Sequence, residues 1–391
     1  MSARADRPLT PSSQISIDTA SEISVVLPCL NEAQTIHPTI ARALRGIAGS
    51  GLSGEVIVVD NGSSDGSDRI AAIAGARVVH ESRPGYGSAL LRGFTEARGR
   101  FVVMADADDT YQLEDLPALI ACLHEGNDLA VANRLAGVSP DAMPWLHRYV
   151  GTPAISWLLR RVYGVCVADS QSGFRAMTRA ALDRLDLRSP GMELASEMLI
   201  KAALGDLRVA EVPSSYQSRV GDSKLRTFRD GCRHLRLILL LAPTYLYILP
   251  GILLTILGIL TFVLAFAAAG GLDVGGLRWQ PVFAGPIFLV VGVNAVSMGL
   301  VVGRLHTLRG FSRRRAAFRP LERMMRAEVG LLIAAIAVLA GIGMDVYLFA
   351  HWAGGGPPHP IGTQLAALAQ TLVIVGTNIG LIGFLATSHE Y

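Results

Sequence analysis

Four long apolar segments fill the C-terminal part of this sequence, and they constrain its structure more than any other feature. They lie near residues 244–269, 281–303, 329–350 and 364–386. About 20 mostly apolar residues suffice for a helix to cross a bilayer, so each segment is long enough. In lipid a segment must satisfy its own backbone polar groups, which favours helices. The sequence therefore predicts a transmembrane domain of four helices over residues 243–391.

The distribution of arginine predicts the orientation of this domain. The connection between Arg304 and Arg326 contains eight arginines and one acidic residue, Glu322. The two other connections, Gly270–Gln280 and His351–Ile361, share one basic residue, Arg278. By the positive-inside rule the Arg-rich connection is cytoplasmic, and an even number of spans then places both termini inside.

The residues before the first span have a different composition, with charged and apolar residues mixed as in a soluble enzyme. Residues 1–21 are polar and lack an apolar core, so we expect a disordered tail and not a signal peptide. The net charge of +3 is too small to indicate a nucleic-acid partner. The four cysteines form no CxxC pair, which favours free thiols over a zinc site or disulfides. We expect a multi-pass protein of the inner or plasma membrane whose N-terminal half is cytoplasmic.

Short apolar strands alternate with helical stretches in the first half, which predicts an α/β domain with a parallel sheet covered on both faces. In such sheets ligands bind at the carboxyl ends of the strands. Polar residues follow each candidate strand at that end. The expected strands are 23–27, 55–59, 77–80, 101–105 and 129–132, and the expected helices lie near 33–46, 67–74, 86–98 and 114–124.

A basic helix is expected immediately before the first span, over residues 225–242. Four arginines recur at helical spacing and share one face, beside an apolar stripe. The pattern is typical of a helix that lies in the headgroup layer, and an ordinary surface helix is the alternative. The arginines are Arg226, Arg229, Arg233 and Arg236, and the stripe is Leu225, Phe228, Cys232, Leu235 and Leu239.

The strand at 101–105 ends in two carboxylates one residue apart, Asp106 and Asp108. Hard oxygen ligands of this kind hold Mg²⁺ or Mn²⁺, and the cation can neutralise a departing diphosphate. Because the two carboxylates directly follow an apolar strand, we interpret them as a pair of metal ligands and not as a solvated acidic turn. Asp109 is either a third acid or a residue at the start of the next helix.

Two glycine-containing turns complete the polar edge. In the turn after Val58–Val59, Asp60 can accept hydrogen bonds from a nucleobase or ribose; the alternative is a plain strand-to-helix turn capped by Asp65 or Ser67. The loop Arg83–Gly93 offers Arg83 and backbone N–H groups, such as that of Gly85, to a diphosphate. It lacks the Gly-Lys-Ser/Thr ending of a Walker loop.

In order and spacing these motifs resemble family 2 glycosyltransferases with the GT-A fold, a Rossmann-like nucleotide-sugar-binding domain, here over residues 22–224. Two further stretches resemble motifs of dolichyl- and polyprenyl-phosphate sugar synthases. Asn61 departs from the family's Asp-Asp pattern, and Asp109-Thr110 departs from the Leu-Gln usual in mannose synthases. The matching stretches are Leu27–Glu32, Val58–Gly66, Pro84–Gly87, Asp106–Asp108, Asp169–Arg175 and Arg219–Leu225.

The resemblance implies roles for individual residues. Pro28, Asn31, Glu32 and Asp60 would hold the nucleoside, and Asp106 and Asp108 the metal. The lipid phosphate would be gripped by Arg134, Arg148, Thr152 and Arg175, while Arg219, Ser223 and Lys224 would close over the phosphates. Asp169 would be either a general base or a residue that orients the phosphate or a sugar hydroxyl.

The expected reaction is a metal-dependent, inverting transfer of a sugar of the glucose or mannose class. The donor would be a UDP- or GDP-sugar and the acceptor polyprenyl phosphate. One alternative is a transferase that builds a glycolipid or polysaccharide, although the Gln-x-x-Arg-Trp motif of processive synthases is missing. The other is an inactive membrane scaffold. Assembly as a homo-oligomer stays open.

Overall fold

A computed structural model of the chain describes residues 21–138, 143–219, 227–308 and 327–387. The chain forms two compact units, each built from segments that are distant in the sequence. We call them the sheet unit (Met1–Thr152, Val167–Leu194 and Arg208–Lys224) and the helical unit (Pro153–Cys166, Ala195–Leu207 and Leu225–Tyr391).

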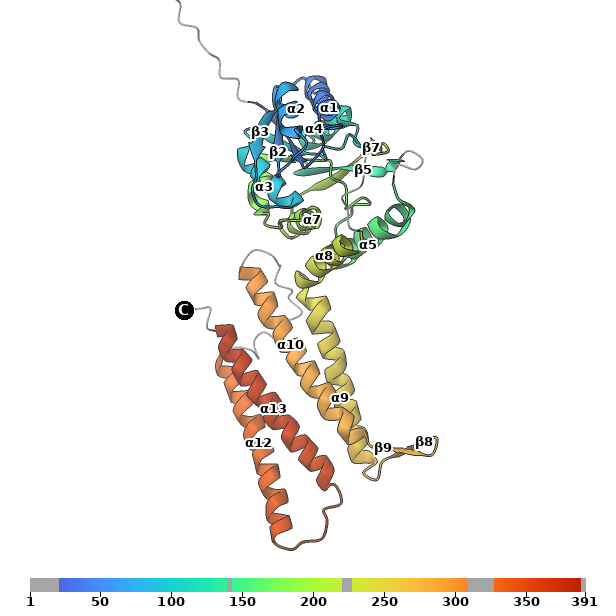
Figure 1. The fold of residues 1–391 in the computed structure, drawn as a ribbon. Coiled ribbons are helices and arrows are strands. Elements are labelled where there is room, and N and C mark those ends of the chain that lie inside the picture. Colours follow the sequence, from blue (N-terminus) through green and yellow to red (C-terminus); the bar gives the residue numbers. More distant parts are fainter. Residues whose placement is uncertain (1–20, 139–142, 220–226, 309–326, 388–391) are drawn as a thin grey trace, which may run out of the picture. The chain divides into compact units, whose positions relative to one another are not determined.

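The sheet unit is built on seven strands in the order β3-β2-β1-β4-β6-β5-β7 (Figure 1). The five predicted strands run parallel to one another, as expected, and β6, which was not predicted, is antiparallel to both β4 and β5. The five predicted strands are present, and β6 and β7 are additional. Their bounds are β1 Ile23–Cys29, β2 Gly54–Asp60, β3 Arg77–His80, β4 Phe101–Met104, β5 Leu129–Val138, β6 Arg175–Thr178 and β7 Val209–Tyr216.

Helices cover both faces of this sheet, as predicted. Alternate residues of β1, such as Val25 and Leu27, belong to a core that also includes residues of α1 and α4. Val26 points the other way, where Gly93 of α3 approaches it closely. The helices that begin in this unit are α1 Ile36–Gly49, α2 Ser67–Ile73, α3 Tyr86–Glu96, the 3₁₀ turn Leu113–Asp115 with α4 Leu116–His124, the π-helical turn His147–Gly151 with α5 Thr152–Tyr163, α6 Arg179–Leu185 and α7 Leu194–Leu204.

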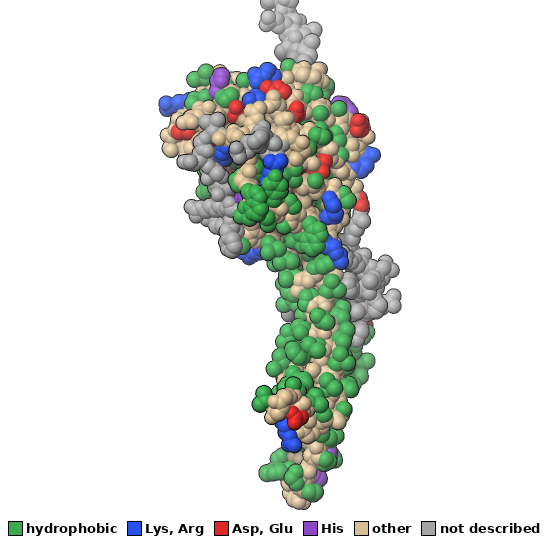
Figure 2. Space-filling model, turned by 90° about the vertical axis from the view of Figure 1, so that its right-hand side faces the viewer, with side chains coloured by type: hydrophobic (Ala, Val, Ile, Leu, Met, Phe, Trp, Pro, Cys, Tyr) green, Lys and Arg blue, Asp and Glu red, His purple; other side chains and the backbone are tan. Residues whose placement is uncertain are grey.

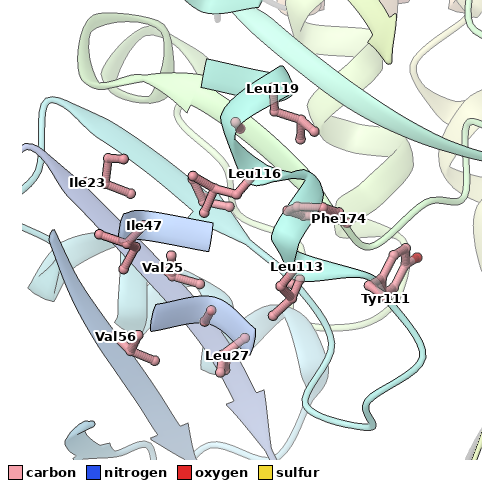
Figure 3. Packing of buried hydrophobic residues seen from close by; sticks show 14 of the residues in the cluster. Ile23, Val25, Leu27, Ile47, Val56, Tyr111, Leu113, Leu116, Leu119 and Phe174 are labelled. Atoms are coloured by element: carbon pink, nitrogen blue, oxygen red, sulfur yellow. The ribbon is translucent and has the colours of Figure 1, made fainter. Parts of the chain in front are cut away.

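The core beneath α1 and α4 ends next to the polar edge. Leu113 and Leu116 pack with strand residues such as Leu27, and Tyr111 and Phe174 lie at the end of this cluster (Figure 3). The rings of Tyr111 and Phe174 meet edge to face, 5.8 Å between centroids. This packing fixes the segments that follow β4 and precede β6.

Among its described residues, the helical unit contains four helices that are long and apolar enough to cross a bilayer, at the predicted places. Hydrophobic side chains predominate on the face of the elongated helical part that Figure 2 shows. A hairpin of β8 (Leu272–Val274) and β9 (Leu277–Trp279) occupies the first short connection and was not predicted. The preceding helix is α8 Thr227–Leu240, and the four apolar helices are α9 Leu249–Ala267 with the π-helical turn Thr244–Ile248, α10 Ala284–Leu308, α12 Ala327–Ala353 and α13 Gly362–Thr387.

Glycines bring these helices together in pairs. A methyl group at Gly258 of α9 would lie 2.6 Å from the Leu289 backbone nitrogen of α10. One at Gly341 of α12 would lie 2.5 Å from the Ala369 carbonyl oxygen of α13. Such close backbone approach is the usual means by which helices associate in lipid. Most of the Arg-rich connection, like the N-terminal tail, lies outside the described residues.

Candidate active site

The turn after β1 is fastened to the turn after β2. Asn31, whose φ is +52°, accepts a hydrogen bond from the Ser64 backbone N–H through its side-chain Oδ1 (2.8 Å). The backbone N–H of Asn31 donates to Ser63 Oγ (2.9 Å). The Glu32 amide donates to Ser67 Oγ (2.8 Å). Asp65 accepts from the amide of Ser67 (3.0 Å). These hydrogen bonds join the turns after β1 and β2, and we call the joined turns, residues 31–32 and 60–67, the cradle.

Asp60 lies in this cradle at the end of β2, with Pro28 on the adjacent strand. Asp60 is buried, and its carboxylate accepts from the amides of Gly62 and Ser63 at 3.2 Å. His80 Nδ1 lies 3.4 Å from Asp60 Oδ2. Asp60 therefore shapes its own turn. The N-cap of α2 is Gly66, without a side-chain cap hydrogen bond, so neither Asp65 nor Ser67 is the N-cap, although Asp65 accepts from the Ser67 amide.

Asn61 has a structural role that explains why an amide suits this position. Its Nδ2 donates to the carbonyls of Glu81 (2.8 Å) and Arg83 (2.9 Å), and its Oδ1 accepts from the Gly85 amide (2.8 Å). A carboxylate could accept from Gly85 but could not donate to two carbonyls. Asn61 thus ties β2 to the glycine loop.

The glycines of that loop allow close packing. Gly85 has φ +142°, and methyl groups at Gly85 and Gly87 would lie 2.2 Å from the carbonyl oxygens of Pro190 and Ser189. The Ser88 amide donates to Pro190 O (3.0 Å). The amides of Gly85 and Ser88 are therefore engaged within the protein, and the phosphate-binding role of this loop stays a prediction. The Arg83 side chain is 75% exposed and pairs with Glu81 at 3.2 Å.

Asp106 and Asp108 follow β4, and each is held by a hydroxyl. Tyr86 Oη donates to Asp106 Oδ1 (2.8 Å), and Thr110 Oγ1 donates to Asp108 Oδ1 (2.6 Å). Gly173 leaves room for Asp106, because a methyl group there would lie 2.7 Å from Asp106 Oδ2. Burial, and then the nearby charge of Asp108, raise the pKa of Asp106 to about 6.

The two carboxylates fit a divalent cation held jointly by protein and ligand. Among the described residues no group of three or more His, Cys, Asp or Glu side chains could hold a metal ion. Mg²⁺ is commonly bound by one or two carboxylates, with substrate phosphates and water filling its shell. Burial is the main cause of the raised pKa of Asp106, followed by the charge of Asp108, and a bound cation would offset the charges of both carboxylates.

Arg219 bridges the cradle and the acid pair. Its guanidinium lies 2.7 Å from Glu32 Oε1 and 3.2 Å from Asp108 Oδ2. Its Nε is buried without a hydrogen-bond partner among the described residues. The structure thus brings together Glu32, Asp108 and Arg219, while Ser223 and Lys224 lie outside the described residues.

Arg134 and Asp169 form a buried, two-point ion pair. Arg134 Nε lies 2.7 Å from Asp169 Oδ2, and Nη2 lies 2.9 Å from Oδ1. The Arg134 amide also donates to Asp169 Oδ2 (3.0 Å), and Glu211 accepts from the Asp169 amide (2.8 Å). The Arg134 guanidinium lies over the Tyr216 ring, 5.3 Å from its centroid. Arg134 lies within β5 and not after it, because β5 extends to Val138.

Other predicted phosphate ligands are less favourably placed. Arg175 is fully buried and donates to the carbonyls of Ser172 (2.9 Å) and Ser170 (2.8 Å), and its burial lowers its pKa to about 10. These contacts support the loop before β6 and do not support a contact with phosphate. Thr152 is buried at the start of α5, and Arg148 lies in the preceding turn with its guanidinium 5.3 Å from the Tyr149 ring.

Asp109 is not at a helix start, because the next helical turn begins at Leu113. It has φ +59°, and its carboxylate pairs with Arg42 Nε at 2.7 Å, several residues before α4 begins.

Three residues that contact the site were not predicted from the sequence: Tyr86, Tyr111 and Glu211. Tyr111 Oη accepts from the Gly173 amide (2.6 Å). These residues act through contacts distant in sequence, which no local motif reveals.

Comparison with known proteins agrees with the resemblance. Residues 24–185 match the family "Glycosyl transferase family 2", and residues 300–388 match "Glycosyltransferase family 2 C-terminal transmembrane region". The chain is 34% identical over 369 residues to the low-salt glycan biosynthesis hexosyltransferase Agl6 of Haloferax volcanii, covering 93% of this chain and 87% of the relative.

Two further similarities cover about half of the chain. A dolichyl-phosphate hexose transferase of Haloferax volcanii is 33% identical over 213 residues, which is 54% of this chain and 90% of the relative. A glucosyl-3-phosphoglycerate synthase structure from Mycobacterium tuberculosis has a TM-score of 0.47 and 28% identity, covering 56% of this chain and 79% of that one. The long match with Agl6 decides the assignment: this chain belongs to glycosyltransferase family 2.

Proposed function

We propose that this glycosyltransferase moves a hexose from a nucleotide-diphosphate donor to polyprenyl phosphate, with a divalent cation at Asp106 and Asp108. A phosphate oxygen of the acceptor attacks the anomeric carbon, its new bond replaces the bond to the donor diphosphate, and the nucleoside diphosphate leaves. When bound, the cation would neutralise charge on that leaving group. Attack from the opposite side would invert the anomeric configuration.

The observation that carries this proposal is that the sheet unit holds both an acidic pair and a buried arginine whose charge acts on that pair. Asp106 and Asp108 form an acidic set suited to a cation and a diphosphate. Arg134, paired with Asp169, is a distinct cationic group that a second phosphate could use. The name of the dolichyl-phosphate hexose transferase relative points to the same class of acceptor.

The geometry favours a positioning role for Asp169. Both of its carboxylate oxygens accept hydrogen bonds from Arg134, and its side chain is fully buried. Both carboxylate oxygens are thus engaged by Arg134, and a phosphate nucleophile is already an anion at neutral pH and does not need a base. We therefore assign Asp169 to holding Arg134 for the acceptor phosphate.

Membrane attachment also favours a lipid acceptor. On α8 the side chains of Cys232 and Leu235, from the predicted apolar stripe, are exposed, as are Arg233 and Arg236, while His234 and Ile238 are buried. An exposed apolar stripe beside a basic one suits the headgroup layer. We accordingly propose that α8 lies at the cytoplasmic surface of the inner or plasma membrane, and that the sheet unit is cytoplasmic.

The test is a transfer assay with the purified full-length protein in detergent. Radiolabelled UDP-glucose, UDP-galactose, UDP-N-acetylglucosamine and GDP-mannose are each supplied with polyprenyl phosphate and Mg²⁺ or Mn²⁺. We expect one donor to give a labelled lipid that mild acid cleaves to the free sugar, and excess EDTA to prevent it. Label that stays water-soluble with all four donors would contradict the proposal.

A further inference from the structure

One buried carboxylate oxygen of the sheet unit has no role in the site described above. Glu193 Oε2 is buried, and it has no hydrogen-bond partner among the described residues. Nearly all buried polar atoms in proteins are hydrogen-bonded, so an exception needs an explanation. Glu193 lies in the sheet unit, just before α7. A bound ligand that donates a hydrogen bond would satisfy this oxygen.

Close backbone packing connects Glu193 to the acid pair. A methyl group at Gly191 would lie 2.4 Å from Glu193 Oε2, so the carboxylate rests on the Gly191 turn. That turn lies against the start of α3, because a methyl group at Gly87 would lie 2.8 Å from Gly191 O. The neighbouring residue, Tyr86, donates its hydroxyl hydrogen bond to Asp106. A short series of contacts therefore leads from Glu193 to Asp106.

The chemistry of the oxygen limits what the ligand can be. An ionised carboxylate only accepts hydrogen bonds, so it does not favour a phosphate. Sugar hydroxyl groups are donors, and a carboxylate can accept from two of them at once. We infer that Glu193 binds hydroxyl groups of the donor sugar and thereby contributes to the choice of hexose. This inference rests on the proposed function for the identity of the donor.

Equilibrium binding to the full-length protein distinguishes the contribution of the sugar to donor affinity from that of the nucleotide. The probes are each nucleotide sugar of the same panel and its free nucleoside diphosphate, titrated by calorimetry into wild type and Glu193→Gln. We expect the variant to bind the nucleotide sugar about ten- to a hundredfold more weakly, as for one lost charge-assisted hydrogen bond, and the free diphosphate unchanged. Glu125→Gln, at an exposed position after α4, is the charge-matched control and should resemble wild type.

Donors lacking single hydroxyl groups then identify the contact. One deoxy donor should bind wild type and Glu193→Gln equally well, because the partner hydroxyl is already missing. Unchanged sugar affinity in the variant, or equal weakening for sugar and free diphosphate, would overturn the inference. If Glu193→Gln fails to fold, Glu193→Asp retains the charge, shortens its reach and is expected to show the same selective loss. A Glu193-dependent sugar affinity without transfer to polyprenyl phosphate would support this inference and refute the proposed function.

Discussion

At the scale of single residues, the site depends on charges that are held by neighbours distant in the sequence. Arg219 bridges Glu32 and Asp108, Tyr86 holds Asp106, and Asp169 holds Arg134. Each of these contacts orients a charged group before any substrate binds. Preorganised charge of this kind is commonly the largest contribution to catalysis of group transfer.

Asp108→Asn should abolish transfer while the protein stays folded. The change preserves shape but removes one of two negative charges that we assign to the cation. We expect Mn²⁺ binding, followed by electron paramagnetic resonance, to weaken together with activity. Asp183→Asn, an exposed position on α6, is the control and should bind and react as wild type. Full activity of Asp108→Asn would rule out the metal assignment.

Arg134 and Asp169 should act as one unit in acceptor use. Arg134→Ala removes the proposed phosphate contact, which is worth about 1.5–3 kcal/mol, or roughly ten- to a hundredfold in acceptor affinity. Asp169→Asn should weaken acceptor use similarly, and the double variant should lose much less than the sum of the two effects. The measurement is a titration of polyprenyl phosphate at saturating donor. Additive losses, or a changed pH dependence of the rate in Asp169→Asn, would instead indicate an independent role as base.

At the scale of secondary structure, the sequence predicted β1 to β5, α1 to α4, α8 and the four apolar helices, and it missed β6, β7 and α5 to α7. The predicted strands and the four apolar helices carry apolar residues in patterns that the local sequence reveals. β6 has four residues and begins with Arg175, so it resembles a loop until its partners β4 and β5 are known. The residues of the cradle could be predicted because they directly follow predicted strands. Tertiary packing determines the contacts of Asn61, the Arg134–Asp169 pair and the burial of Arg175, so these could not be predicted from the local sequence.

Two glycines of α12 offer a matched test of helix pairing. Gly341→Val should separate α12 from α13, because even a Cβ would lie 2.5 Å from the Ala369 carbonyl oxygen. Gly343 has no heavy atom within 4 Å of that position, so Gly343→Val should be tolerated. Thermal unfolding in detergent compares the two variants with wild type. Equal stability of both variants would contradict the close packing of this helix pair.

At the scale of the whole molecule, we predict one orientation in the membrane. The Arg-rich connection and both termini should face the cytoplasm, and the connections containing Asp273 and Pro358 should face outward. Single cysteines at Arg315, Asp273 and Pro358, in a background without the native four, can be treated with an impermeant thiol reagent in intact cells. We expect labelling at Asp273 and Pro358 only. Labelling at Arg315 from outside would refute the orientation.

The central claim is that the acceptor is polyprenyl phosphate, and it can be tested with the protein reconstituted in lipid vesicles. At saturating donor, the rate is compared for polyprenyl phosphate, the same polyprenol without phosphate, and glycerol phosphate as a soluble phosphate. If Arg134 binds the acceptor phosphate and the chain of the acceptor lies in the membrane, polyprenyl phosphate should react far faster than the polyprenol or glycerol phosphate. Preference for glycerol phosphate, or equal use of the polyprenol without its phosphate, would contradict the account.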